Sequence, residues 1–280
     1  MHIGINAWTF DRAMPLAEMV ETARRAGFQT FEPTLEADGE CGLTADEPAW
    51  RRIGQTIRDA GLQVSSLACG LFMSFPYTSR DPAVRQKAHD ITLALLDRAA
   101  WVGAPVVMVI PGLVARAERG VLETPYQDAQ RYALEVMQTL CYEAEARNVQ
   151  IAVENAWTQF LISPVEMREF LDRVNSGWIG AYLDIGNVMR YGVPQDWIET
   201  LGRRILRVHV KDFQLKVGNS SGYCPIGDGD VDWPAVIAAL RTTRYDGPLT
   251  CEGKGDPADM AARLRRVLDA AAQNQPDTPR

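Results

Sequence analysis

Short apolar runs of strand length alternate with longer segments of helical character along the whole chain, and this alternation restricts the folds open to it. Several of the longer segments begin with a helix-start signal, such as Asp81 followed by Pro82 and Ser163 followed by Pro164. Regular strand–helix alternation is typical of parallel sheets, because each parallel strand needs a crossover to return the chain. Eight such pairs in 280 residues predict a single-domain α/β fold, the (β/α)8 TIM barrel.

The predicted barrel spans residues 1–272, and residues 273–280 are expected to form a polar tail. Its eight strands are predicted at 2–7, 30–35, 63–69, 105–110, 150–154, 179–183, 205–210 and 248–251. A doubly wound open sheet uses the same units, but no Gly-x-Gly-x-x-Gly turn follows the first run, which favours the barrel. Thr44 and Glu47 resemble a capping box before a helix at 50–60, and 218–232 is predicted to be a loop.

Four successive apolar runs of the second half end in a residue that can bind a metal ion: Glu154, Asp184, His209 and Glu252. The carboxyl ends of barrel strands meet at one rim, where the active sites of such barrels lie. Any one of these residues alone is better explained as a cap, a surface ion pair or a core histidine. Four together predict a divalent-metal site. Three carboxylates and one imidazole suit Mn²⁺, Mg²⁺ or Co²⁺ best, with Zn²⁺ or Fe²⁺ as alternatives.

Composition narrows the partners of the chain. The formal net charge is −7 and no basic stripe is present, which disfavours nucleic-acid partners. The five cysteines form no Cys-x-x-Cys pair and indicate reduced, cytosolic thiols rather than a disulfide framework. No signal-peptide pattern and no apolar run of about 18 residues occurs, so neither secretion nor membrane spanning is expected. A cytoplasmic protein is predicted.

Five short motifs give the chain a resemblance to a known family. They are VEN at 153–155, LDIGN at 183–187, HVKD at 209–212, GDGDVDW at 227–233 and CEG at 251–253. With these motifs the chain resembles the sugar phosphate isomerase/epimerase family within the xylose isomerase-like TIM barrels. That superfamily also holds D-tagatose 3-epimerase, L-ribulose-5-phosphate 3-epimerase and endonuclease IV. The resemblance covers nearly the whole chain, with its specific motifs in the second half.

The resemblance implies an enzyme that isomerises or epimerises a ketose or a ketose phosphate. It implies one divalent ion, with Mn²⁺ expected ahead of Mg²⁺, Co²⁺ or Zn²⁺, held by Glu154, Asp184, His209 and Glu252. Glu154 and Glu252 would also act as acid and base on opposite faces of the substrate, through a cis-enediolate. Members of the family are commonly dimers or tetramers, so a homodimer or homotetramer is expected.

Further residues are candidates for contact with the sugar. Asn187 stands where the tagatose-epimerase branch carries a substrate-contacting histidine, whereas the phosphate-sugar branch tolerates asparagine there. Phe160 stands where the tagatose-epimerase branch has a glutamate. Both departures argue against free D-tagatose or D-psicose as the substrate. Lys211 follows His209 by two residues, so on a strand it shares the same face and is expected to point into the barrel mouth. The alternative for Lys211 is a solvated lysine at a strand end.

Three more candidates lie in the loops and strands of the same rim. Trp8 and Trp157 follow the first and fifth strands, where an aromatic ring stacks on a sugar face or simply packs in a lid. Glu32, on the second strand, is expected to orient a metal ligand or a sugar hydroxyl, or else to cap a turn. These three complete the predicted set of substrate-binding residues.

Three other functions compete with isomerisation. A lyase or dehydratase acting on an oxidised (keto) sugar or an inositol would use the same base and metal to expel a substituent. Hydrolysis of the endonuclease IV type needs several more histidines than the three in this chain, and His2 and His89 are poorly placed for it. A non-catalytic sugar-binding module is disfavoured because all four candidate ligands are present.

Overall fold

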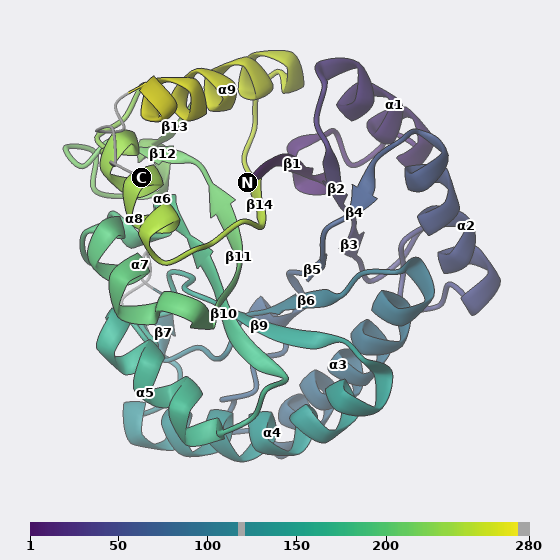
Figure 1. The fold of residues 1–280 in the computed structure, drawn as a ribbon. Helices are drawn as coiled ribbons and strands as arrows, with labels where there is room; N and C mark the ends of the chain where they lie inside the picture. The colour runs from purple at the N-terminus through teal and green to yellow at the C-terminus, as the bar shows by residue number, and fades with distance from the viewer. Residues whose placement is uncertain (117–120, 274–280) are drawn as a thin grey trace.

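The computed structural model describes residues 1–116 and 121–273, which form a closed barrel of parallel strands with helices outside (Figure 1). The ten strands of the main sheet follow the order β3-β5-β6-β9-β10-β11-β14-β1-β2-β4. They are β1 (His2–Asn6), β2 (Thr30–Glu32), β3 (Thr34–Leu35), β4 (Gln63–Val64), β5 (Leu67–Cys69), β6 (Val106–Val109), β9 (Gln150–Glu154), β10 (Ile179–Asp184), β11 (Ile205–Val210) and β14 (Pro248–Cys251). The predicted polar tail lies, except for Gln273, outside the described residues.

Ten strands occupy eight positions because two predicted strands are interrupted. The run at 30–35 splits at Pro33, which has no N–H to donate, into β2 and β3. The run at 63–69 likewise splits into β4 and β5, and β2 pairs with β4 while β3 pairs with β5. β1 pairs in parallel with both β14 and β2, which closes the ring. The predicted TIM barrel is therefore confirmed.

A ring of helices covers the outside of the barrel (Figure 1). Among the described residues these are α1 (Leu16–Ala26), α2 (Glu47–Asp59), α3 (Pro82–Val102), α4 (Tyr126–Arg147), α5 (Pro164–Val174), α7 (Pro194–Leu201), α8 (Trp233–Thr242) and α9 (Pro257–Gln273). Asp81 and Ser163 cap α3 and α5 as predicted. The expected start of α2 was wrong. Asp46, whose carboxylate accepts the Ala49 N–H at 2.9 Å, caps it in place of Thr44 because Pro48 follows closely at the helix start.

The loops at the carboxyl end of the barrel carry their own small elements. β12 (Asp212–Phe213) pairs antiparallel with β13 (Tyr223–Cys224), so the predicted loop at 218–232 contains one strand of a hairpin. β7 (Ala115–Arg116) and β8 (Val121–Leu122) form a second hairpin. A short helix, α6 (Ile185–Val188), directly follows β10. α6 and β12 closely follow β10 and β11, the strands that carry the candidate ligands Asp184 and His209.

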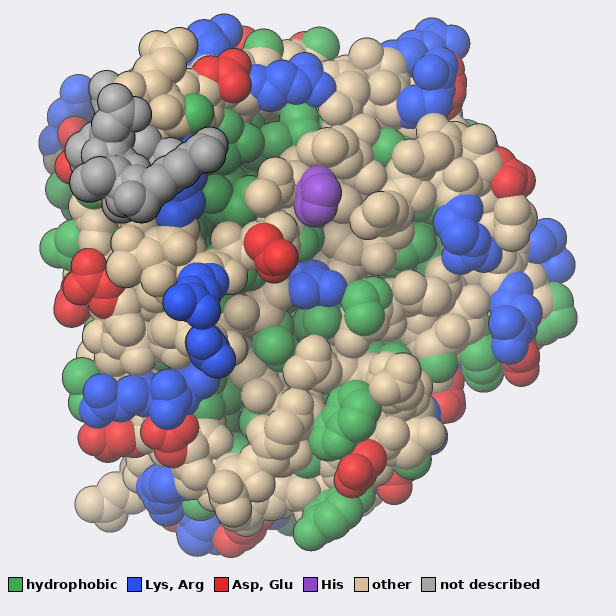
Figure 2. Space-filling view, viewed as in Figure 1, with side chains coloured by type: hydrophobic (Ala, Val, Ile, Leu, Met, Phe, Trp, Pro, Cys, Tyr) green, Lys and Arg blue, Asp and Glu red, His purple; other side chains and the backbone are tan. Residues whose placement is uncertain are grey.

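The surface on the side seen in Figure 1 carries Lys and Arg side chains interspersed with Asp and Glu (Figure 2). Within the described part of the chain, no helix has the length and apolar character needed to cross a membrane.

Candidate metal centre and active site

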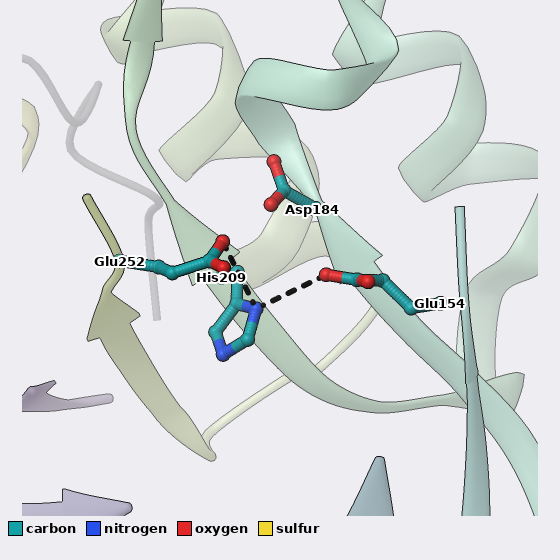
Figure 3. Close-up of side chains that lie close together, drawn as sticks. All are labelled: Glu154, Asp184, His209 and Glu252. Carbon is teal, nitrogen blue, oxygen red and sulfur yellow. Dashed lines mark hydrogen bonds and ion pairs between the residues drawn. The ribbon is translucent and has the colours of Figure 1, made fainter. Parts of the chain in front are cut away.

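The four predicted ligands come together at the carboxyl rim of the barrel. Glu154 and Asp184 are the last residues of β9 and β10, His209 lies near the end of β11, and Glu252 directly follows β14. Parallel pairing sets Asp184 opposite His209 and His209 opposite Thr250, so adjacent strands reach the rim at the same height. The four side chains point toward a common centre (Figure 3).

The donor set fits a divalent cation. One ligand atom from each of the four residues lies within 4.8 Å of the others. His209 Nδ1 is 3.3 Å from Glu154 Oε1 and 3.5 Å from Glu252 Oε2. Asp184 and His209 are fully buried, and the Glu252 side chain is 16% exposed, which leaves the group open on one side only. Three carboxylates gathered this closely need positive charge between them.

Glu32 fixes the orientation of the His209 ring. Its Oε2 lies 2.7 Å from His209 Nε2, on the side of the ring away from the cluster. Glu32 is fully buried and also accepts hydrogen bonds from Asn6, Ser66 and Tyr182. Burial opposes ionisation, but His209 and these donors outweigh it and lower the pKa of Glu32. An ionised Glu32 holds the proton on Nε2 and leaves the Nδ1 lone pair for a metal ion. Glu32 therefore faces a candidate ligand.

Lys211 lies inside the acidic group. Its ammonium nitrogen is 2.7 Å from Asp184 Oδ2 and 2.6 Å from Glu252 Oε2. The Asp184 contact is an ion pair without hydrogen-bond geometry, since Oδ2 has no hydrogen-bond partner among the described residues. Burial and the neighbouring carboxylates raise the pKa of Asp184 to about 7 against the attraction of Lys211. Burial also acts to raise the pKa of Glu252, but Lys211 and His209 outweigh it and lower that pKa to about 2.

Backbone contacts hold Asp184 in place. Asn155 Oδ1 accepts the Asp184 N–H at 2.8 Å, and Asn155 Nδ2 donates to the Asp184 carbonyl at 2.9 Å. Asp184 Oδ1 in turn accepts the Asn187 N–H at 2.8 Å and caps α6. The asparagines of the VEN and LDIGN motifs thus fix the candidate ligand between them. With Oδ1 engaged in this cap, Oδ2 is the oxygen that faces the cluster.

An aromatic wall stands beside Lys211. Trp157 stacks on Tyr223 with ring centroids 5.0 Å apart, and Lys211 Nζ lies 4.9 Å from the centroid of the Tyr223 ring. Trp157 Nε1 donates to the Asn187 carbonyl at 3.0 Å, and the Tyr223 hydroxyl donates to Asn187 Oδ1. The sequence analysis missed Tyr223, which reaches the site from β13. Phe160, by contrast, is buried against aromatic rings of the outer layer.

Asp212 anchors the loop that carries this wall. It is fully buried, and its two oxygens accept hydrogen bonds from four donors, which are the N–H groups of Phe213, Gly227 and Val231 and the indole Nε1 of Trp233. A Cβ at Gly229 would lie 2.2 Å from Asp212 Oδ1, so only glycine fits there. The GDGDVDW motif is therefore the partner of the HVKD aspartate. In the sequence, the GDGDVDW motif contributed to the family resemblance, but no structural role was predicted for it.

A cavity of about 1300 Å³ opens next to Glu252. The loops after β1, β3 and β5 form most of its wall, and Trp8 is one of the lining residues. Trp8 Nε1 donates to Glu36 Oε1 at 3.0 Å, and its ring packs against Gly70. The candidate ligand Glu252 belongs to both the cluster and the cavity wall, so a molecule in this cavity would reach the cluster.

The fold and this site define a class: a TIM barrel with a three-carboxylate, one-histidine group at the carboxyl rim. The family model described as "Xylose isomerase-like TIM barrel" matches residues 20–272, and the chain belongs to this family. The resemblance seen in the sequence is thereby confirmed.

Named proteins resemble the chain over nearly all of its length. The L-ribulose-5-phosphate 3-epimerase UlaE of Escherichia coli O157:H7 (strain EC4115 / EHEC) is 25% identical over 93% of this chain and 91% of its own length. A solved structure of L-ribulose 3-epimerase covers 99% of both chains with a TM-score of 0.82 and 19% identity. One of D-psicose 3-epimerase with D-fructose covers 98% of this chain and 99% of its own, with a TM-score of 0.79 and 17% identity. These two structures share the fold.

Proposed function

We propose that the protein is a divalent-metal-dependent epimerase or isomerase of a ketose or ketose phosphate. It would remove and return the proton on a carbon next to the carbonyl, through a cis-enediolate. The names of the similar proteins support this class, since they are epimerases of L-ribulose 5-phosphate, L-ribulose and D-psicose.

The placement of two glutamates carries the proposal. Glu154 and Glu252 approach His209 Nδ1 from opposite sides, at 3.3 and 3.5 Å (Figure 3). Inversion at carbon needs one group to take a proton from one face and a second group to return a proton to the other. Two carboxylates facing one another across a partly open site meet that requirement.

The ionisation of Glu252 suits the role of a proton acceptor. Against burial, Lys211 and His209 lower its pKa to about 2, so it is ionised at neutral pH. The carboxylate accepts the substrate proton as a base and, once protonated, can return it as an acid in the reverse direction. Lys211, 2.6 Å from Glu252, is placed to hold this carboxylate in position and to meet negative charge on a substrate oxygen.

Glu154, Asp184, His209 and Glu252 would hold the metal ion, with Mn²⁺ preferred for this set of hard donors. A bound divalent ion would supply Lewis-acid stabilisation of the negative charge that develops on the substrate oxygens. Asp184 and His209 would serve in binding only, because one caps α6 and the other is held by Glu32.

Solvent deuterium exchange tests the proposal. The protein is stripped with EDTA, reloaded with Mn²⁺ and incubated in D₂O with matched free and phosphorylated ketoses, and incorporation is followed by NMR. We expect exchange at a carbon beside the carbonyl, dependent on the metal and reduced by about 10²–10⁴-fold in E154Q and E252Q. Exchange in the presence of EDTA would overturn the metal assignment. Loss of a substituent from an oxidised sugar or an inositol, without exchange on any ketose, would show a lyase.

A further inference from the structure

The side chains that line the cavity beside Glu252 are predominantly acidic. The acidic side chains that line it are Asp11, Glu36, Asp38, Glu40 and Glu252. Its two basic side chains, Arg12 and Lys254, are exposed, as are the acidic Asp11, Asp38 and Glu40. Arg12 lies in the loop after β1 and Lys254 in the loop after β14. The loop after β5 contributes Gly70, Leu71 and Ser74 to the lining and no basic side chain. The cavity is therefore poorly suited to a phosphate dianion and well supplied with hydrogen-bond acceptors.

Glu36 is a half-buried acid of this wall, and its contacts fix it in place. Trp8 Nε1 and Thr34 Oγ1 both donate to the same oxygen, Oε1, at 3.0 Å. No hydrogen bond to the other oxygen, Oε2, occurs among the described residues, so it remains an acceptor for a ligand. The Glu36 carboxylate is thus oriented before any ligand arrives. Fixed acceptors of this kind select hydroxyl donors.

Trp8 adds an apolar surface to this acceptor. Its indole is held at Nε1 by Glu36 and lies against Gly70, where a Cβ would be 3.4 Å from the ring. Trp8 and Glu36 both line the cavity that Glu252 also lines. A ring beside a carboxylate acceptor is a combination that recognises the carbon skeleton and a hydroxyl of a sugar together.

We propose that the substrate is an unphosphorylated ketose. Its far end would lie against Trp8 and donate a hydroxyl hydrogen bond to Glu36 Oε2, while its reacting end meets Glu154 and Glu252. Glu36 would also repel a terminal phosphate, which makes it the residue that discriminates between a free ketose and its phosphate. This proposal rests on the ketose reaction proposed above.

Matched pairs of substrates test the proposal. Mn²⁺-loaded wild type, E36Q and E169Q are compared on free ketopentoses and ketohexoses and on the terminal phosphate of each. Glu169 is an exposed acid on α5, so E169Q removes the same charge far from the cavity. We expect kcat/KM of the wild type to favour the free sugar by at least about tenfold. E36Q should reduce that preference by about tenfold, mainly through KM, and E169Q should keep the wild-type ratio.

A binding measurement separates this proposal from the reaction on which it rests. Isothermal titration calorimetry with the same ligands, in the D₂O buffer of the exchange experiment, measures their binding affinities. It reports the preference for the free ketose over its phosphate even when no exchange occurs. If the wild type binds free ketoses more tightly than their phosphates, and this difference is smaller in E36Q, the cavity assignment is supported. If exchange is absent in the same samples, only the proposed reaction is overturned. Tighter binding or faster turnover of the phosphates by the wild type overturns the proposal. So does an unchanged ratio in E36Q, or the absence of binding by both members of every pair.

Discussion

The ammonium nitrogen of Lys211 lies 2.7 Å from Oδ2 of Asp184, the oxygen that faces the candidate metal ligands. It also lies 2.6 Å from Glu252 Oε2. Without a metal ion, this ammonium supplies the positive charge that the clustered carboxylates require. Asp184 and Glu252 outweigh burial and raise the pKa of Lys211 well above its usual value, so the charge is retained at neutral pH.

Replacing Lys211 by methionine is expected to destabilise the metal-free protein. Breaking a buried ion pair on one side costs about 3–5 kcal/mol, which corresponds to a melting temperature lower by roughly 5–15 °C for a chain of this size. Mn²⁺ should recover most of the loss, because it replaces the missing charge. Calorimetry with and without Mn²⁺ measures this, with K87M, an exposed lysine of α3, as the control. Equal melting temperatures for metal-free K211M and wild type would contradict it.

Replacing Glu32 by glutamine is expected to weaken metal binding by about 10–100-fold. The new amide must place an N–H₂ group against Asn6, Ser66 or Tyr182, all of which donate to Glu32, and it no longer holds His209 by charge. Titration with Mn²⁺ and the absorption spectrum of the Co²⁺-loaded protein report this change. Y182F removes one donor and keeps the Glu32–His209 bond, so its affinity should stay near that of the wild type. Equal losses in both variants would refute the role of Glu32.

The affinity for Mn²⁺ should fall as the pH drops below neutrality. Burial raises the pKa of Asp184 to about 7, and a metal ion binds only the ionised form. Below that pKa each metal ion must displace the Asp184 proton, so this group alone should lower the affinity by about tenfold per pH unit as the pH falls. Titrations from pH 5.5 to 8.5 test this. An affinity that is flat across this range would show that Asp184 is already ionised at its lower end.

The raised pKa of Asp184 also makes the folding stability of the metal-free protein depend on pH. The unfolded chain releases the Asp184 proton near its ordinary value of 3.8, whereas the folded metal-free chain retains it up to about 7. The contribution of Asp184 to the free energy of unfolding is therefore fully present below its pKa in the unfolded chain. It is lost as the pH rises through its pKa in the folded chain. Chemical denaturation of the metal-free protein should show this contribution declining between about pH 4 and 7.

Replacing Asp212 by alanine is expected to release the loop between β12 and α8. Four donors, among them the Gly227 N–H and Trp233 Nε1, lose their buried acceptor, at a cost of about 3–5 kcal/mol. Hydrogen exchange should become faster at 213–233, including Tyr223. D212N retains one acceptor oxygen and should show a smaller effect. Unchanged exchange in D212A would mean that other contacts hold the loop.

The positions of the candidate ligands could be predicted because each lies at the end of an apolar strand. The order of strands along the chain is also their order around most of the ring, so Glu154, Asp184 and His209 are brought together by local pattern alone. The break of the 30–35 run at Pro33 has an equally local cause, because proline lacks the N–H that the strand ladder needs.

The roles of Tyr223 and Glu36 could not be predicted in this way, whereas for Glu32 the orientation of a metal ligand was one of three predicted alternatives. Tyr223 reaches Asn187 only because β13 pairs with β12, a contact between segments ten residues apart in a loop with no strand pattern. Glu36 and Trp8 meet across neighbouring loops of the rim. Glu32 bonds to His209 across the barrel interior, 177 positions along the chain. These relationships depend on which loops and strand faces the closed ring sets opposite one another.

The candidate ligands and the cavity walls come from different parts of the chain. β9, β10, β11 and the end of β14 carry the cluster, whereas the loops after β1, β3 and β5 form most of the cavity. Each loop is attached to a strand that the barrel already holds rigidly. Most of the cavity wall is therefore encoded in the first third of the sequence, apart from the candidate ligands. Substitutions in these loops would change the cavity wall and leave the four candidate ligands of the second half in place.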